Sequence, residues 1–176
     1  RHHITPIVSL WHFTFPHWLC DFHRRQKHGW LHPLAREHWT TYVQKVVAAL
    51  APVVDIYAPQ NEPNTHSMMG FLTTLWPPAL GFSPGLYYEN MTLAAEFYRE
   101  AVKIIRQKKP QSLIVSIQNF VFWKRSKMDL FKIFYTYGKE FNCFHLDRIA
   151  DVTDWIGFTY YMGEMASPLA LRSQAK

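Results

Sequence analysis

The chain has 176 residues, of which 48% are hydrophobic and 18% are charged, so it can bury a core and is not a disordered segment. Its net charge of +6 is dispersed along the sequence, which argues against a nucleic-acid-binding surface. No apolar run reaches the ~18 residues that a membrane-spanning helix needs. The two cysteines, Cys20 and Cys143, form no disulfide framework, and no secretory leader pattern stands at the start, so we expect a cytoplasmic protein.

In chain order, the hydrophobic pattern predicts four short strands that alternate with three amphipathic helices. Apolar runs predict strands over residues 4–10, 53–57, 113–117 and 155–160. Spacings of three and four predict helices over residues 33–50, from about 89 to 109, and from a cap at Ser126 to 141. A long loop is expected from Asn61 to about Tyr88, and residues 162–176 show no period. The expected buried face of the first helix consists of Trp39, Tyr42, Val43, Val46, Val47 and Leu50. The expected buried face of the third helix consists of Leu130, Ile133, Phe134, Tyr137 and Phe141.

Alternation of short apolar strands with amphipathic helices is typical of an α/β fold with a parallel sheet covered by helices. No glycine-rich phosphate-binding motif follows a strand, which argues against nucleotide-binding folds. Polar and aromatic residues crowd the carboxyl ends of all four strands, as in the active site of a (β/α)₈ TIM barrel. These residues are His12, Asn61 with Glu62, Asn119 with Trp123, and Tyr160 with Tyr161. Because a closed barrel needs eight strands, residues 1–176 are predicted to form one partial barrel domain.

Glu62 is the carboxylate that this arrangement singles out, because it stands where a strand ends and a loop begins. A carboxyl at that place points into the mouth of a barrel, although a glutamate on a solvated loop is the ordinary alternative. Asn61 offers a donor and an acceptor suited to a sugar hydroxyl. Pro63 is expected to bias Glu62 toward an extended backbone.

Several motifs in order resemble glycoside hydrolase family 1, which contains β-glucosidases, β-galactosidases and 6-phospho-β-glycosidases. Residues 6–16 (PIVSLWHFTFP) resemble the third strand of the family barrel, and Gly29-Trp30 the end of the following loop. Residues 57–64 (YAPQNEPN) resemble the fourth strand with its Asn-Glu-Pro signature, and residues 154–161 (DWIGFTYY) the sixth strand. Residues 81–85 (GFSPG) resemble a Pro-Gly turn in the intervening loop. The resemblance therefore covers strands 3 to 6, the middle portion of a family member.

The resemblance implies a retaining hydrolysis of a terminal β-linked sugar by two glutamates, without a cofactor. It makes Glu62 the acid/base, and it places Asn61 on the sugar 2-hydroxyl and His12 on another hydroxyl. Tyr161 matches the tyrosine that bonds the nucleophile. Phe13 stands where many members have tryptophan, and so keeps a stacking face for the sugar without the N–H group.

Two departures from the family pattern concern the nucleophile and its surroundings. Thr159 stands where members usually have asparagine, so a polar contact near the nucleophile is expected to be shortened. In the family that the sequence resembles, the nucleophile stands on the seventh strand in a Thr-Glu-Asn-Gly-like run, which does not occur in these 176 residues. Glu164 is the only local carboxylate that could replace it, and we interpret it as a loop residue. The other glutamates, Glu37, Glu89, Glu96, Glu100 and Glu140, are expected in or beside helices.

Other patterns add no function. His17, His23, His28 and His32 share a loop, but their irregular spacing predicts no metal site. Asn90-Met91-Thr92 matches a glycosylation sequon, which we interpret as chance. We expect a small β-glycoside or oligosaccharide as partner, with the sugar and the oligomeric state not predicted. The alternative is a non-catalytic sugar-binding protein that has lost its nucleophile, or a truncated remnant of such a barrel. An isolated half-barrel would leave two sheet edges and a helix layer uncovered, so we expect it to aggregate, swap or unfold.

Overall fold

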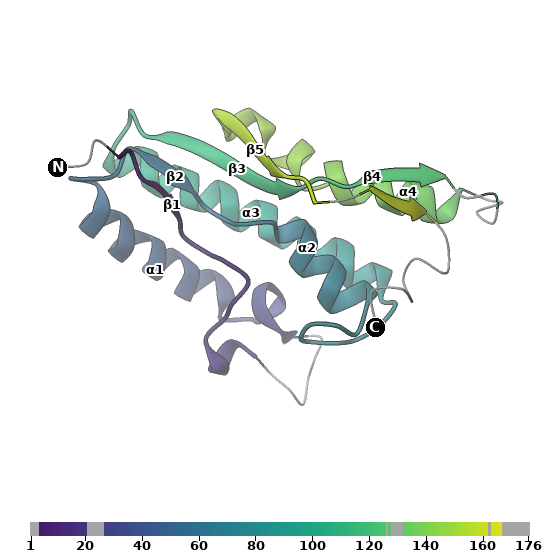
Figure 1. Ribbon diagram of the computed structural model, residues 1–176. Helices are drawn as coiled ribbons and strands as arrows, with labels where there is room; N and C mark the ends of the chain where they lie inside the picture. The colour runs from purple at the N-terminus through teal and green to yellow at the C-terminus, as the bar shows by residue number, and fades with distance from the viewer. Residues whose placement is uncertain (1–3, 21–26, 126, 128–131, 162, 167–176) are drawn as a thin grey trace.

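The computed structural model describes residues 4–20, 27–125, 127, 132–161 and 163–166. Its centre is a four-stranded parallel sheet in the order β1-β2-β3-β5, which confirms the predicted parallel α/β arrangement (Figure 1). The strands are β1 (Ile7–Ser9), β2 (Ile56–Ala58), β3 (Leu113–Asn119) and β5 (Trp155–Thr159). Each strand lies beside the next one in this order, as expected for consecutive units of a barrel.

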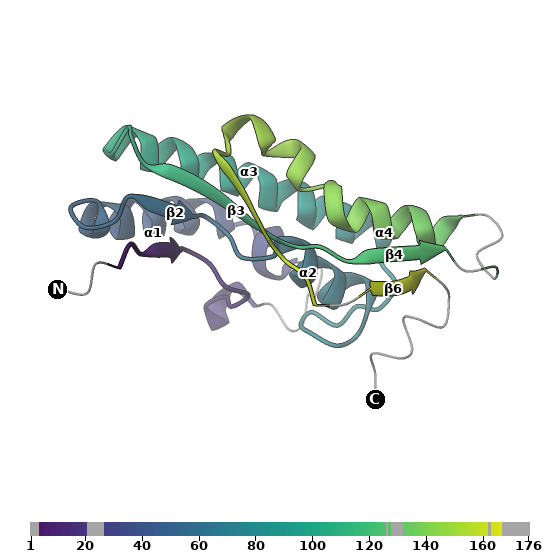
Figure 2. The same ribbon diagram turned by 45° about the horizontal axis from the view of Figure 1, so that its top comes forward.

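Three longer helices connect the strands: α1 (Ala35–Leu50), α3 (Pro84–Lys108) and α4 (Ile133–Cys143). Helices α1 and α3 lie together behind the sheet (Figures 1 and 2). Short helical segments fill the connections, namely η1 (His17–Leu19), η3 (Gly29–Leu31), α2 (Pro63–Ser67), the π-helical η4 (Met68–Leu72), η5 (Leu146–Arg148) and η6 (Ala150–Val152). Strand β4 (Phe122–Arg125) pairs in parallel with β6 (Gly163–Ala166) in a separate small sheet.

The main core lies between the sheet and helices α1 and α3. Helix α1 buries Trp39, Val43 and Val47, which the helical repeat of four places on one face. The Trp39 indole N–H donates to the Phe97 carbonyl of α3 at 2.8 Å, so the two helices share a hydrogen bond as well as apolar surface. The predicted buried face of the first helix is therefore largely confirmed.

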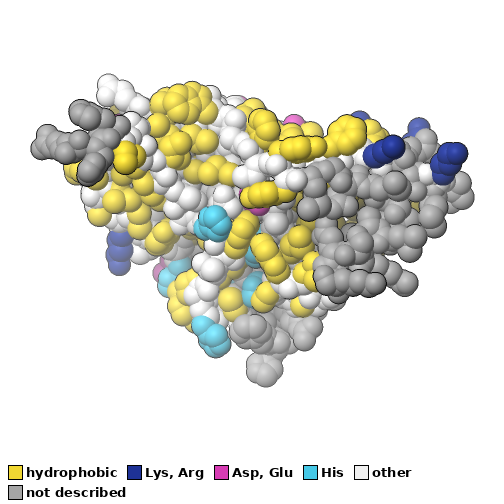
Figure 3. Space-filling view, in the orientation of Figure 1, with side chains coloured by type: hydrophobic (Ala, Val, Ile, Leu, Met, Phe, Trp, Pro, Cys, Tyr) yellow, Lys and Arg dark blue, Asp and Glu magenta, His cyan; other side chains and the backbone are white. Residues whose placement is uncertain are grey.

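The two outer strands are exposed while the inner ones are covered. All three residues of β2 are buried, whereas Ile7 of β1 is 54% exposed and Ile156 and Phe158 of β5 are 56% and 65% exposed. Hydrophobic side chains spread widely over the face seen in Figure 3. An open parallel sheet with apolar edges is the expected shape of part of a barrel, whose neighbouring strands and helices would cover these residues.

Several predicted boundaries are wrong for identifiable reasons. Strand β1 has three residues rather than seven, and β2 begins only at Ile56, because the amides of Val53 and Val54 bond back to the Leu50 carbonyl at the end of α1. Tyr42, expected in the core, is 43% exposed, although its hydroxyl donates to the Leu10 carbonyl at 2.7 Å. Ile133, expected in the core, is 48% exposed at the first residue of α4. Ser126 and Leu130 lie outside the described residues.

The segment expected to be a loop from Asn61 to about Tyr88 instead contains α2, η4 and the start of α3. Its Pro63 opens α2, a position at which the missing N–H group is not needed. Strands β4 and β6 were not predicted either, and Glu164 stands in β6 rather than in a loop. In the part of the chain that the structure describes, no helix has the length and apolar character to cross a membrane.

Candidate active site

The carboxyl ends of β1, β2, β3 and β5 bring five polar side chains together. Asn61 and Glu62 follow β2, and a backbone bridge between Asn61 and Ile117 extends the pairing of β2 with β3. His12 follows β1, Asn119 ends β3 and Thr159 ends β5. His12 contacts Asn61, and Thr159 contacts Glu62. Asn119 is linked to Glu62 through the Thr65 hydroxyl. The predicted clustering at this edge is therefore present for His12, Asn61, Glu62 and Asn119, while Thr159 was not predicted to belong to it.

Glu62 turns the chain from strand into helix in a single residue. Its amide donates to the Ile117 carbonyl of β3 at 2.8 Å, and its own carbonyl accepts from the amides of Thr65 and His66 in α2. Both sets of bonds require a sharp reversal, and Glu62 accordingly adopts the left-handed conformation, with φ 42° and ψ 55°. The predicted extended backbone is wrong. A non-glycine residue in this region stores about 1 kcal/mol of strain, which the flanking bonds offset.

The Glu62 carboxyl is buried, with the residue 5% exposed, and each of its oxygens accepts a hydroxyl hydrogen bond. Thr65, one turn along α2, donates to Oε2 at 3.1 Å, and Thr159 of β5 donates to Oε1. The Asn119 amide group donates to the Thr65 hydroxyl at 3.1 Å. A buried carboxylate is tolerated only when it is hydrogen-bonded, and these hydroxyls meet that requirement.

Asn61 and His12 lie together beside Glu62. The Asn61 side-chain nitrogen is 3.5 Å from His12 Nε2, and the Asn61 amide donates to the Trp11 carbonyl at 2.9 Å. Asn61 is buried, whereas the His12 ring is exposed at the edge of the sheet. Both side chains can donate to and accept from a hydroxyl group, so the pair suits a polyhydroxylated ligand.

Phe13 forms an aromatic wall with Trp76, a residue that the sequence did not single out. The ring centroids are 4.9 Å apart, and both rings border a cavity of about 350 Å³. Phe13 has φ 67°, so the chain turns sharply after His12. Tyr161 is 70% exposed beyond β5, and Trp123 packs in β4 against Phe141 rather than at the sheet edge.

His66 lies one turn after Glu62 in α2 and brings no charge to the site. It is buried, at 3% exposed, and packs edge-on against the rings of Trp11 and Phe15, whose centroids are 5.2 and 5.4 Å from the His66 ring. Burial, with a smaller effect of nearby His28, lowers the pKa of His66 to about 3. The imidazole is therefore neutral at ordinary pH and acts as a packing residue.

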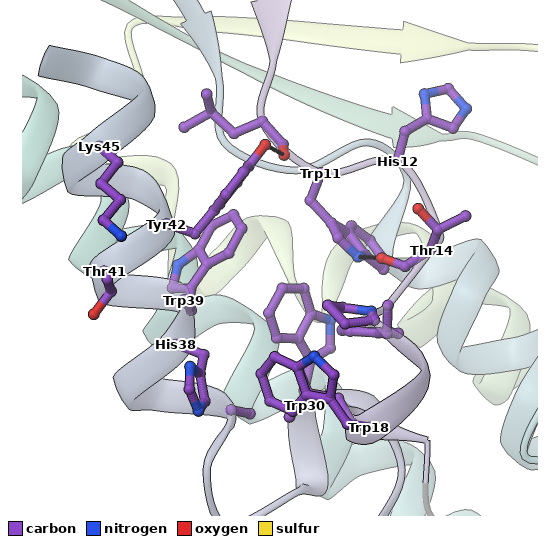
Figure 4. A pocket seen from close by; sticks show the side chains of 15 residues that line it. Trp11, His12, Thr14, Trp18, Trp30, His38, Trp39, Thr41, Tyr42 and Lys45 are labelled. Atoms are coloured by element: carbon purple, nitrogen blue, oxygen red, sulfur yellow. Dashed lines mark hydrogen bonds between the residues drawn. The ribbon is translucent and has the colours of Figure 1, made fainter. Parts of the chain in front are cut away.

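A second, larger cavity of about 610 Å³ lies on the α1 side of β1 (Figure 4). Glu62 borders neither this cavity nor the smaller one beside Phe13 and Trp76. Aromatic rings form a large part of the wall of the larger cavity, including Trp11, Trp30 and Trp39, while His12 is turned away from the tryptophan rings. Its lining comes from the segment that follows β1, an outer strand of the sheet, and from α1. This position fits a space between neighbouring barrel units better than a catalytic site.

The remaining candidates lie elsewhere. The helical glutamates, Glu37, Glu89, Glu96, Glu100 and Glu140, occupy α1, α3 and α4 as predicted. Asn90 is fully buried and its amide group donates to Ser67 at 2.7 Å, so the sequon is not accessible in the folded chain. Among the described residues, no group of three histidines, cysteines or carboxylates could hold a metal ion, and His23 lies outside them.

The sequence matches the model of glycosyl hydrolase family 1 over residues 1–119. A β-galactosidase of Pyrococcus woesei is 31% identical over 87 residues, which are 46% of this chain and 16% of that protein. The cytosolic β-glucosidase of Homo sapiens is 30% identical over 124 residues, which are 68% of this chain and 25% of that protein. The chain thus spans a quarter or less of the length of these relatives.

Solved structures agree in fold. Fpglu1 from Fervidobacterium pennivoraus superposes with a TM-score of 0.80 and 24% identity, over 92% of this chain and 36% of that one. A β-glycosidase from Pyrococcus horikoshii superposes with a TM-score of 0.71 and 27% identity, over 92% of this chain and 40% of that one. The fold is therefore that of part of a TIM-barrel glycosidase. Since the family model matches about two thirds of its residues, the chain belongs to glycosyl hydrolase family 1.

Proposed function

We propose that this chain carries the acid/base half of a retaining β-glycosidase, with Glu62 as the acid/base. The observation that supports this most is a buried, hydrogen-bonded carboxylate at the carboxyl edge of a parallel sheet, in a chain of family 1. Relatives named β-glucosidase and β-galactosidase favour a β-linked terminal sugar as substrate. Two carboxyl groups supply the proton transfers and the nucleophile, so the reaction requires no cofactor. We also propose that the protein is cytoplasmic and that residues 1–176 form a single partial-barrel domain.

In the first step Glu62, as a carboxylic acid, protonates the glycosidic oxygen while a second carboxylate attacks the anomeric carbon. The bond to the aglycone breaks, and the sugar becomes an ester of the nucleophile. In the second step Glu62, now a carboxylate, takes a proton from water as that water attacks the same carbon, and the ester bond breaks to release the nucleophile as a carboxylate. The two steps return Glu62 to the acid form and give a sugar with retained configuration.

The neighbouring residues bind the sugar in this proposal. Asn61 holds the 2-hydroxyl, a contact that strengthens as the anomeric carbon gains positive charge. His12, 3.5 Å from Asn61, binds a second hydroxyl of the same ring. Phe13, backed by Trp76, offers an apolar face to the sugar. Tyr161 reaches the nucleophile from the segment after β5.

The nucleophile lies outside this chain in our proposal. Apart from Glu62, the carboxylates whose side chains the structure describes occupy helices or precede strands. Asp55 and Asp154 stand before β2 and β5, at the opposite edge of the sheet from Glu62. Retention needs a second carboxyl about 5 Å from the first, which these positions do not offer. A glutamate on a further strand beyond β5 is the expected partner.

Kinetics of Glu62→Gln test the assignment in a protein that carries this chain together with a nucleophile-bearing strand. Hydrolysis of glycosides with poor leaving groups should fall by about 100-fold or more in the first step, because these substrates need proton donation. Formation of the glycosyl-enzyme from substrates with good leaving groups should fall much less. Equal losses in that step for both substrate classes would remove Glu62 from the acid role.

The chain alone separates this function from the sugar-binding alternative. We expect the 176-residue chain to hydrolyse a chromogenic β-glucoside no faster than its Glu62→Gln variant, because it lacks the nucleophile. A clear Glu62-dependent rate would contradict the placement of the nucleophile outside the chain. A protein that contains a complete barrel and binds the sugar without any turnover would favour the non-catalytic alternative.

A further inference from the structure

The two oxygens of the Glu62 carboxyl are held in different ways. Oε2 accepts from Thr65, which belongs to the same helical turn, and Oε1 accepts from Thr159, 97 residues away on β5. The proposed acid/base must exist as a carboxylic acid in one step and as a carboxylate in the next. A hydroxyl group that stays bonded to Glu62 in both steps must donate to the carboxylate form and be compatible with the acid form.

The Thr65 hydroxyl is committed to donating to Glu62. Its oxygen accepts from the Asn119 side-chain nitrogen at 3.1 Å, and its single proton points to Oε2 at 3.1 Å. Asn64 holds Asn119 in place, because its side chain bonds the Asn119 carbonyl at 2.7 Å and the Asn119 amide at 3.3 Å. With a donor on one side, the Thr65 hydroxyl keeps the same direction in both forms of Glu62.

The Thr159 hydroxyl has a second acceptor within reach. Its oxygen lies next to Oε1 of Glu62 and 3.4 Å from the Gln118 carbonyl of β3. When Glu62 is ionised, the hydroxyl donates to Oε1. When Glu62 carries a proton, the Thr159 oxygen can accept that proton's hydrogen bond while its own hydrogen turns to the Gln118 carbonyl. The second bond is long and weak, but it leaves no buried group without a partner.

We propose that Thr159 is a positioning residue whose hydroxyl reverses its hydrogen bond to Glu62 between the two steps and holds the carboxyl in place in both. This inference rests on the proposed acid/base function. The asparagine that the family usually carries here cannot act in this way with one atom, since its nitrogen only donates and its oxygen only accepts. The hydroxyl of Thr159 does both. Thr159 therefore belongs to Glu62 rather than to the surroundings of the nucleophile, where the sequence had placed it.

The experiment compares Thr159→Val, Thr159→Ser and Glu62→Gln in a protein that carries this chain with a nucleophile-bearing strand. Single-turnover rates are measured for glycosyl-enzyme formation with a poor leaving group, and for its hydrolysis after a good leaving group has departed. Thr159→Val keeps the size of the side chain and removes the hydroxyl. We expect it to slow both steps roughly tenfold, with KM changed less than twofold, while Thr159→Ser restores both rates to within about threefold.

The outcomes distinguish the two levels of the proposal. If Glu62→Gln slows neither step, the proposed function fails. If Glu62→Gln slows them and Thr159→Val changes neither or only one, the function stands and the reversing hydrogen bond is refuted. Thr136→Val makes the same substitution at an exposed position of α4, where the hydroxyl donates to the Lys132 carbonyl, and should leave both rates unchanged.

A second measurement applies if Thr159→Val does not fold. In the unsubstituted protein, proton NMR should find a slowly exchanging hydroxyl signal for Thr159, because the group is held between two acceptors. This signal should move when Glu62→Gln is introduced, since the amide that replaces the carboxylate changes the partner of that hydroxyl. A signal that exchanges at the rate of solvent-exposed hydroxyls, or that ignores Glu62→Gln, would overturn the inference.

Discussion

Acidification should destabilise this chain strongly, because two histidines are folded into its interior as neutral rings. His66 is 3% exposed and His145 is 1% exposed, and burial lowers the pKa of each to about 3 from an ordinary value of 6.5. The unfolded chain binds a proton at each ring below pH 6.5, whereas the folded chain does not until about pH 3. The stability contributed by these rings is thus complete above pH 6.5 and is lost as the pH falls toward 3.

The size of the effect follows from these pKa values. At pH 5.5, protonation of the unfolded state lowers the free energy of unfolding by about 1.4 kcal/mol for each ring relative to pH 8, or about 2.8 kcal/mol for both. With a urea dependence of about 2 kcal/mol per molar, the unfolding midpoint should fall by roughly 1.4 M. Tryptophan fluorescence at low protein concentration reports the transition, because Trp30 and Trp39 are buried.

A variant identifies the responsible ring. His66→Phe keeps an aromatic ring between Trp11 and Phe15 and removes the titrating group, whose Nδ1 has no partner among the described residues. We expect about half of the change between pH 8 and 5.5 to disappear. An unchanged pH dependence in His66→Phe, or a midpoint that is the same at both pH values in the unsubstituted chain, would refute the reasoning.

Two further substitutions test the packing. Gly138→Ala should lower the free energy of unfolding by about 1–3 kcal/mol, because a methyl group there would overlap the Trp123 ring and outweigh the better helix propensity of alanine. Gly85→Ala is the matched control, since open space surrounds Gly85. Urea unfolding curves in which both variants behave alike would contradict this account. Trp39→Phe should lower the free energy of unfolding by about 1–2 kcal/mol, because it removes the hydrogen bond to the Phe97 carbonyl and part of the buried ring. An unchanged urea midpoint would show that this bond does not stabilise the contact between α1 and α3.

Much of the fold could be predicted from the sequence because its elements carry strong periodic signals. The helical spacing of Trp39, Val43 and Val47 predicts the buried face of α1, and short β-branched runs predict the order of the parallel strands. The exact strand limits could not be predicted, since Val53 looks like a strand residue but is 70% exposed in the turn after α1. Hydrophobicity alone does not distinguish such a residue from one inside a sheet.

The candidate site was predicted in part. The strand-end positions of Glu62, Asn61 and His12 follow from the alternation of strands and helices, and the structure brings them together. The left-handed backbone of Glu62 could not be predicted, because Pro63 favours the opposite conformation locally and hydrogen bonds to β3 and α2 override it. The contact of Thr159 with Glu62 depends on the neighbouring positions of β3 and β5, which no local pattern encodes.

Azide competition with the Glu62→Ala variant tests the central claim most directly, in a protein that carries this chain with a nucleophile-bearing strand. Azide needs no base to attack the glycosyl-enzyme, so it should restore turnover of a substrate with a good leaving group. The account predicts a glycosyl azide of β configuration, formed by attack on the face that water uses. No restoration of rate, or an α-glycosyl azide as expected when the nucleophile itself is missing, would contradict the assignment of Glu62 as the acid/base.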